Sequence, residues 1–223
     1  MSLRRRFFAA VYDSQMRRSE KAGLTDMRIA LVSQAEGTVL EIGAGTGANL
    51  GHYSPSATSL TVTEPDVHMF KRLERHAQTV APSAMLLRAP AEDLPFEDGT
   101  FDTVVSTLVL CGVDDQPRAV REIRRVLRPG GRLLFLEHVR ADDPKIAKKQ
   151  DKMNRINRAV VCCDCNRPTL ETIEAAGFEV TALEHTVLPK APPFARPSIV
   201  ATAVAPGSSA PQALPTRSAS APH

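Results

Sequence analysis

A short apolar segment that ends in three alternate glycines does most to limit what this chain can fold into. Residues 39–47 read Val-Leu-Glu-Ile-Gly-Ala-Gly-Thr-Gly, with Glu41 two positions before the first glycine. The apolar run predicts a buried strand, and the glycines predict a tight turn at its carboxyl end. Turns of this kind bind dinucleotides, phosphates or S-adenosylmethionine, so the segment predicts a ligand site and leaves the ligand open.

Strand and helix patterns alternate after this segment. We expect strands at residues 38–42, 60–63, 85–88, 101–110 and 132–137, helices at 66–79 and 116–127, and the start of a helix at 48–52. Strands separated by helices pair in parallel through right-handed crossovers, so the fold class is α/β, a Rossmann-like, doubly wound sheet. Ligands bind such sheets beyond the carboxyl ends of the strands.

The flanking segments differ in composition from this central part. Residues 3–32 have apolar residues at helical spacing interrupted by Gly23, and the chain closes with residues rich in Pro, Ala and Ser. Helices at 145–161 and 169–176 and strands at 178–187 and 199–204 complete the pattern. We therefore predict an N-terminal helical lid at 1–34, a ligand-binding domain at 35–204 and a disordered tail at 205–223.

Charge and hydropathy exclude several classes of protein. The 223 residues include 28 basic and 25 acidic side chains, a net charge of +3 that indicates no nucleic-acid partner. The residues Arg4–Arg6 precede a short apolar run, but Tyr12 and Asp13 end it too early for a secretory signal. No segment has the about 20 apolar residues that span a bilayer. These features predict a cytoplasmic protein without a transmembrane segment, and its oligomeric state stays open.

Three of the four cysteines crowd into one segment. Cys162, Cys163 and Cys165 are too close in sequence to pair comfortably, and Cys111 stands alone. A structural zinc site usually offers two separated ligand pairs, which this arrangement lacks. We expect reduced thiols and no metal.

Charge helps to choose among the ligands of the glycine turn. The pattern Gly43-x-Gly45-x-x-Ala48 with Glu64 fits a dinucleotide fingerprint weakly, and the Gly-Lys-Ser/Thr of a phosphate loop is absent. The carboxylate of Glu41 would repel a pyrophosphate but suit a ligand with an ammonium and a sulfonium. Neither tyrosine has a lysine four residues later, as hydride chemistry would favour. S-adenosylmethionine is the preferred ligand.

Five segments in order resemble class I S-adenosylmethionine-dependent methyltransferases of the branch that contains the ubiquinone and menaquinone methyltransferases. They are Glu-Ile-Gly-Ala-Gly-Thr-Gly at 41–47, Thr-Glu-Pro-Asp at 63–66, Ala-Glu-Asp-Leu-Pro-Phe at 91–96, Phe-Asp at 101–102 and Leu-Arg-Pro-Gly-Gly at 127–131. The resemblance covers residues 39 to about 178. It implies a mostly parallel, seven-stranded sheet with an antiparallel final strand, and it makes 35–204 a methyltransferase domain.

The resemblance also implies which residues hold the cofactor. Glu41, Gly43 and Gly45 would lie at the methionine end, and Glu64 would accept hydrogen bonds from the ribose hydroxyls. Ala91 and Glu92 would lie beside the adenine. Pro90 departs from the family, whose members often have Asp or Asn there. The full expected set is Glu41, Gly43, Ala44, Gly45, Glu64, Pro65, Ala91, Glu92 and Ser106.

The methyl acceptor is less constrained than the cofactor. Residues 107–111, 137–139 and 165–166 are similar to thiol S-methyltransferases and to bacterial relatives that act on natural products, so a small thiol is the favoured acceptor. His138 follows the fifth predicted strand and is a possible base. Tyr12, Asp164 and Asn166 are further candidates for the catalytic or acceptor site. C- or O-methylation of a quinol or aromatic metabolite and a non-catalytic, cofactor-binding regulator stay open as alternatives.

Overall fold

A seven-stranded sheet forms the centre of the molecule. The structure is a computed structural model that describes residues 16–207. The strand order is β3-β2-β1-β4-β5-β7-β6. These strands are β1 (Gly37–Ile42), β2 (Ala57–Thr63), β3 (Met85–Leu87), β4 (Phe101–Thr107), β5 (Leu127–His138), β6 (Glu179–Val187) and β7 (Pro197–Val204). The strands β1 to β5 pair in parallel, and β7 is antiparallel to both β5 and β6. The predicted fold and its antiparallel final strand are confirmed.

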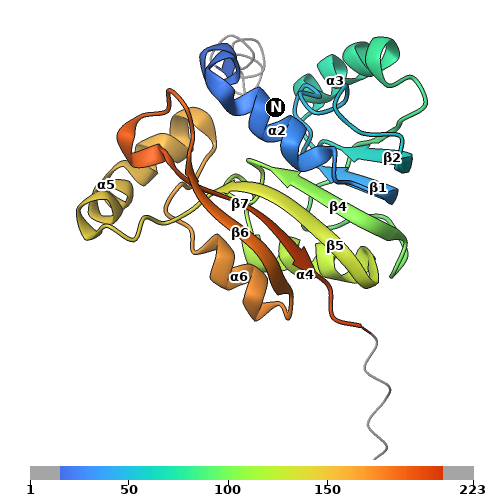
Figure 1. The fold of residues 1–223 in the computed structure, drawn as a ribbon. Helices are drawn as coiled ribbons and strands as arrows, with labels where there is room; N and C mark the ends of the chain where they lie inside the picture. The colour runs from blue at the N-terminus through green and yellow to red at the C-terminus, as the bar shows by residue number, and fades with distance from the viewer. Residues whose placement is uncertain (1–15, 208–223) are drawn as a thin grey trace, which may run out of the picture.

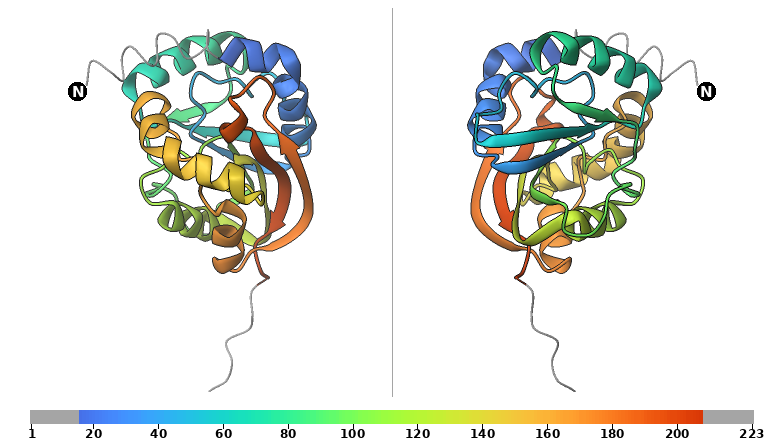
Figure 2. Two further views of the ribbon diagram at one scale, coloured as in Figure 1. Left: turned by 90° about the vertical axis from the view of Figure 1, so that its left-hand side faces the viewer. Right: turned by 90° about the vertical axis from the view of Figure 1, so that its right-hand side faces the viewer.

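Helices cover both faces of the sheet (Figures 1 and 2). One apolar cluster joins alternate residues of β4 and β5 to α4 (Gln116–Val126) and α6 (Thr169–Ala175). The opposite face packs on α2 (Thr25–Val32) and α3 (Val67–Val80). The central strands carry apolar residues on both sides because both of their faces are covered.

Local sequence signals explain where three of the helices begin. Asp66, Asp115 and Asp143 each accept a hydrogen bond from a backbone N–H in the first turn of α3, α4 and α5 (Pro144–Val161). Proline occupies the first turn of α4 and of α5, where a missing N–H costs nothing. Pro65 instead lies before the cap of α3, so our expectation of a helix start at residue 66 was one position early.

Other expected boundaries needed correction. Residues 48–52 do not open a helix: residues 45–51 form hydrogen-bonded turns, and three glycines in this region weaken helical propensity. The strand expected to reach residue 110 ends at Thr107, because Leu108 has a φ of 60° and breaks the extended backbone. Gly23 interrupts the N-terminal helical stretch as expected: its φ of 120° is not helical and kinks the chain within the π-helix η1 (Glu20–Leu24), so two helical pieces meet there. Ala205, where we expected a disordered tail to begin, bonds through its backbone to Gly130 and Gly131, and residues 208–223 of that expected tail lie outside the described residues.

Candidate active site

The glycine turn follows β1 directly and has a backbone that other residues adopt only with strain. Gly43, Gly45 and Gly47 have φ values of 56°, 60° and 89°. A Cβ atom on Gly43 would lie 2.5 Å from Cγ1 of Val109. The turn after β1 therefore packs directly against the loop after β4. Gly43 needs to be glycine for two reasons: its φ is positive, and its Cα lies too close to Val109 for a side chain to fit.

Glu64, the residue after β2, connects the glycine turn to the start of α3. Its Oε2 accepts a hydrogen bond from the Gly45 N–H at 2.9 Å, and its Oε1 accepts one from the Asp66 N–H at 2.8 Å. Burial raises the pKa of Glu64 to about 7, although these two backbone donors lower it. Glu64 is therefore a buried carboxylic acid whose pKa lies close to neutral pH, at the carboxyl end of a strand. Hydroxyl groups of a ligand can donate hydrogen bonds to it and so stabilise its ionised form.

Glu41 lies in a buried polar network that sequence reasoning did not anticipate. Its Oε1 accepts from Asn49 Nδ2 at 2.9 Å, and its Oε2 accepts from the Tyr53 hydroxyl at 2.7 Å. Burial raises the pKa of Glu41, and Tyr53, Asn49 and the nearby Arg28 lower it. Both carboxylate oxygens therefore have protein donors, and contact between Glu41 and the methionine end of a cofactor stays a prediction.

Arg28 completes this network from the N-terminal helical stretch. Its guanidinium donates to Asn49 Oδ1 at 3.2 Å, to Thr107 Oγ1 at 2.9 Å and to Glu20 Oε1 at 3.1 Å. The side chain is only 5% exposed. Arg28 thus ties the N-terminal helix to the glycine turn and to the end of β4. The sequence pattern of the helix that contains Arg28 gave no sign that this residue links the two segments, because Asn49 and Thr107 are far from it in sequence.

We expect Arg28→Met to destabilise the fold by about 3 kcal/mol, because the change breaks the ion pair with Glu20 and leaves the buried amide oxygen of Asn49 without its donor. Denaturant unfolding would measure the loss. The matched control is Lys71→Met on the exposed side of α3, which should change the unfolding free energy by less than about 0.5 kcal/mol. A loss below about 1 kcal/mol for Arg28→Met would show that the network contributes little.

The remaining cofactor candidates lie in two loops at the same end of the sheet. The Ala44 N–H donates to the Thr63 carbonyl at 3.0 Å, and Pro65 accepts at its carbonyl from Arg88. Ala91 is 5% exposed and packs in the core. Glu92 accepts from the Asp114 N–H at 2.7 Å. Glu92 therefore holds the loop before α4, a role in addition to the adenine contact that the resemblance implies.

Ser106 requires a correction. It was expected among the cofactor residues, but it lies inside β4 and is fully buried. Its hydroxyl donates to Glu137 Oε1 at 2.7 Å, and the same oxygen accepts from the N–H groups of Val109 and Leu110. The Ser106 side chain is therefore committed to Glu137. Ser106 and Glu137 meet because they lie on the same face of the neighbouring parallel strands β4 and β5. Through the N–H groups of Val109 and Leu110, Glu137 holds the loop that contacts Gly43.

His138 is the last residue of β5 and is 7% exposed. Burial lowers its pKa to about 4, and the backbone carbonyls of Pro197 and Ala195 offset only part of this effect. Its Nδ1 has no hydrogen-bond partner in the part of the chain that the structure describes. The imidazole is therefore neutral at physiological pH and is a weak base.

The carboxylate of Asp164 lies among cationic and amide side chains. Its carboxylate accepts hydrogen bonds from Asn154, Arg158 and Arg167. Burial alone would raise the pKa of Asp164, but Arg167, Asn154 and Arg158 lower it. Such a firmly ion-paired carboxylate is poorly suited to accept a proton.

Asn166 and Tyr12 are the other two candidates for the acceptor site. The Asn166 amide donates to Asp151 on α5, so its side chain is directed to that helix. Tyr12 lies outside the described residues.

The cysteine segment packs on the loop after β4. All four cysteines are free, and Cys111 and Cys165 are buried. A hydrogen bond to Cys163 and burial raise the pKa of Cys111 well above its ordinary value, and burial raises the pKa of Cys165 to about 12. These two thiols are protonated at neutral pH and are poor nucleophiles. Within residues 16–207, no group of His, Cys, Asp and Glu side chains could hold a metal ion.

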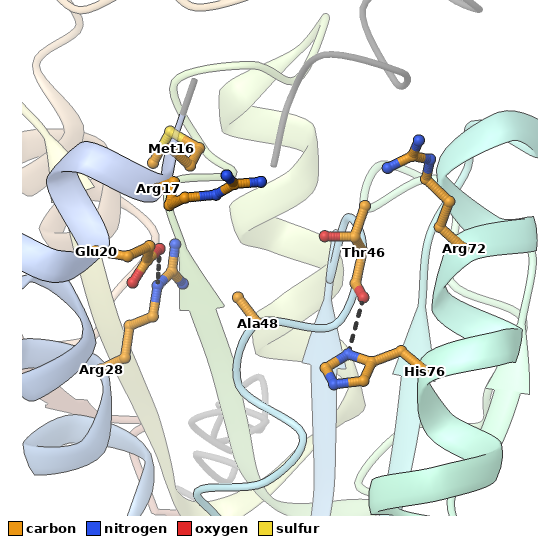
Figure 3. Close-up of a pocket in the computed structure, with 8 residues that line it drawn as sticks. All are labelled: Met16, Arg17, Glu20, Arg28, Thr46, Ala48, Arg72 and His76. Atoms are coloured by element: carbon orange, nitrogen blue, oxygen red, sulfur yellow. Dashed lines mark hydrogen bonds and ion pairs between the residues drawn. The ribbon is translucent and has the colours of Figure 1, made fainter. Parts of the chain in front are cut away.

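A cavity of about 440 Å³ opens beside the glycine turn, between the N-terminal helical stretch and α3 (Figure 3). The side chains of Arg17 and Arg72 extend over the turn from opposite sides, and His76 Nδ1 lies 3.2 Å from the Thr46 carbonyl. Three arginines and one glutamate line the cavity, which favours an anionic group. The lining residues are Met16, Arg17, Glu20, Arg28, Thr46, Ala48, Arg72 and His76, and none of them was an expected cofactor residue.

Comparisons with known proteins identify the family of this chain. A model of the methyltransferase domain family matches residues 40–135. Human thiol S-methyltransferase TMT1A is 30% identical over 215 residues, which cover 88% of this chain and 82% of the human protein. The ubiquinone/menaquinone C-methyltransferase UbiE of Hahella chejuensis is 48% identical over 65 residues, 29% of this chain and 26% of that enzyme.

Solved structures show the same fold. The structure of a possible histamine N-methyltransferase from Thermotoga maritima superposes with a TM-score of 0.67 at 21% identity and covers 90% of this chain and 97% of its own. This chain belongs to the class I S-adenosylmethionine-dependent methyltransferases, and S-adenosylmethionine is its cofactor. No helix in residues 16–207 is long and apolar enough to cross a membrane.

The residues on the rim fit this cofactor. The buried carboxylate of Glu64 has a pKa of about 7 and can accept hydrogen bonds from a ribose diol. The positive φ values of Gly43 and Gly45 form the turn directly beyond β1, at the end of the sheet where α/β folds bind their ligands.

Proposed function

We propose that this protein transfers a methyl group from S-adenosylmethionine to the sulfur of a small, fairly apolar thiol. The observation that carries the proposal is the relationship to a thiol S-methyltransferase, which extends over 88% of the chain and therefore beyond the cofactor motifs. The similarity to the quinone C-methyltransferase spans only 29% of the chain. We propose a cytoplasmic location as well, which the four free cysteines support.

The cofactor, when bound, would supply an electrophilic methyl group on a sulfonium; a thiolate sulfur would form the new bond to the methyl carbon as the sulfonium–methyl bond breaks, with S-adenosylhomocysteine as the leaving group. Glu64 would hold the ribose, and the turn at Gly43 and Gly45 would receive the methionine end. The thiol proton needs an acceptor, and a neutral His138 with a pKa of about 4 is too weak to hold it. We therefore propose that the acceptor thiol loses its proton to water before transfer, because a thiol of pKa about 8.5 is partly ionised near pH 7.

An assay with methyl-labelled cofactor and a panel of thiols, phenols and quinols tests the proposal. We expect label on the sulfur of thiols and a rate that rises about tenfold per pH unit until it levels near the pKa of the thiol. A rate that is already constant above about pH 5 would instead indicate that His138, with its pKa of about 4, removes the proton from the thiol. Label on oxygen or carbon alone would contradict the thiol acceptor and support the quinol or aromatic alternative. Cofactor binding without turnover of any acceptor would indicate a regulator.

A further inference from the structure

The outer face of α5 carries an unusual concentration of positive charge. The helix spans 18 residues, which corresponds to a length of about 27 Å. Its opposite face is held to the domain: Ala147 and Gln150 are buried, and Gln150 bonds to the carbonyls of Val139 and Cys165. Five cationic side chains lie on the exposed face, namely Lys145, Lys148, Lys149, Lys152 and Arg155.

These five cations make no ion pair within residues 16–207, whereas Arg140, which precedes the helix, and Arg158, near its end, do. Arg140 pairs with Asp151 at 2.7 Å, and Arg158 pairs with Asp114 at 2.8 Å. The acidic residues near the exposed face are Asp142 and Asp143, which precede the first turn, and the paired Asp151. The fold therefore neutralises the flanks of α5 and leaves a strip of uncompensated positive charge along its outer face.

Two large aliphatic side chains continue the same strip. Ile156 is 58% exposed and Val160 is 61% exposed. At 100° per residue, Lys145, Lys149, Lys152, Ile156 and Val160 fall within one sector of about 80°. Lysines followed by exposed aliphatic residues on one helix face suit a surface that is both anionic and apolar beneath its charges.

The position of α5 makes this face accessible and relevant to the site. The helix forms one side of the molecule and runs across the front in the left view of Figure 2. Its end is joined to the loop after β4, because the Asp164 N–H donates to the Cys111 carbonyl at 2.8 Å and Arg158 pairs with Asp114. A surface bound by α5 would therefore lie close to the loop that contacts the glycine turn.

We infer that the outer face of α5 docks this protein on an anionic lipid surface. Lipid headgroups supply the negative charge that the lysines require, and the acyl region receives Ile156 and Val160. A nucleic acid would also attract the lysines, but the face has no aromatic side chain on which bases could stack. The inference concerns peripheral binding and is independent of the identity of the methyl acceptor.

Cosedimentation of the full chain with vesicles tests the inference. We expect binding to phosphatidylcholine vesicles that contain 30% phosphatidylserine and none to pure phosphatidylcholine vesicles. Lys148→Gln combined with Lys152→Gln should weaken binding at least tenfold, because each basic residue near an anionic bilayer contributes about fivefold. Ile156→Ser combined with Val160→Ser should leave a weaker interaction that disappears at 0.5 M salt.

Matched variants make the result decisive. Lys71→Gln combined with Arg75→Gln removes two exposed cations from α3 and should leave vesicle binding unchanged. Equal weakening by the α3 and α5 pairs would overturn the inference, as would loss of binding only when Arg4, Arg5 and Arg6 are replaced by glutamine. Absence of binding to anionic vesicles, or tighter binding to a 20-nucleotide RNA than to vesicles, would also overturn it. Circular dichroism would confirm that each variant is folded.

Discussion

Glu64→Ala should weaken the binding of S-adenosylmethionine at least 100-fold. Hydrogen bonds to a charged acceptor contribute about 1.5–3 kcal/mol each, and the substitution removes the carboxylate that would accept from the ribose hydroxyls. It also frees the N–H groups of Gly45 and Asp66, which Glu64 holds at 2.9 and 2.8 Å. Titration calorimetry measures the effect, with Glu74→Ala on the exposed side of α3 as the control. Affinity within threefold of the unmodified protein would exclude the assigned role.

The same carboxylate predicts how cofactor affinity depends on pH. The pKa of Glu64 is about 7 because burial disfavours the charged form. Ribose hydroxyls donate to the ionised form, so bound cofactor should lower this pKa, and binding should release a proton near and below pH 7. Affinity should therefore be constant above about pH 8 and fall about tenfold per unit below pH 7. Glu64→Gln should remove this dependence; a Gln variant that retained it would assign the titration to another group.

Gly43→Ala should disable the glycine turn. A positive φ costs an alanine about 1–2 kcal/mol, and overpacking costs about 1–3 kcal/mol more. Here the new Cβ would lie 2.5 Å from Cγ1 and 2.9 Å from Cγ2 of Val109, a β-branched side chain that cannot easily move away. We expect a loss of about 3 kcal/mol in stability, a fall of roughly 6–12 °C in Tm, and little cofactor binding.

Two variants separate the causes of this effect. Gly51→Ala should leave stability within about 0.5 kcal/mol, because Gly51 has no neighbour within 4 Å of the added Cβ. Val109→Ala in the Gly43→Ala background should recover the steric part of the loss and leave the part caused by positive φ. Wild-type stability in Gly43→Ala alone would mean that the two loops can separate without cost.

The sequence predicted those parts of the molecule that depend on neighbouring residues. The alternating strands and helices and the glycine turn follow from local patterns of hydropathy and backbone freedom. The antiparallel final strand came from the family resemblance. Glu64 was identified because it directly follows a strand, and strand ends in a parallel sheet share one edge. Boundaries were less accurate where one backbone angle decides them, as at Leu108.

The burial, hydrogen-bond partners and protonation of individual side chains could not be predicted from local sequence patterns. Ser106 was expected among the cofactor residues and His138 as a possible base, but strand register places Ser106 on Glu137 and buries His138 beside β7. Asp164 was a catalytic candidate from the sequence, and the fold brings Arg158 and Arg167 to its carboxylate. Each outcome depends on partners that are distant in sequence or on the depth of burial.

The sequence by itself determined the fold class and the position of the glycine turn, because both have a local signal, and the family resemblance predicted that Glu64 binds the ribose. Only the tertiary structure decided that Arg28, Asn49 and Tyr53 surround Glu41, that Glu64 has a pKa of about 7, and that α5 turns its lysines outward. Charge, protonation and exposure depend on what packs around a group in three dimensions, and that packing is set by the whole chain.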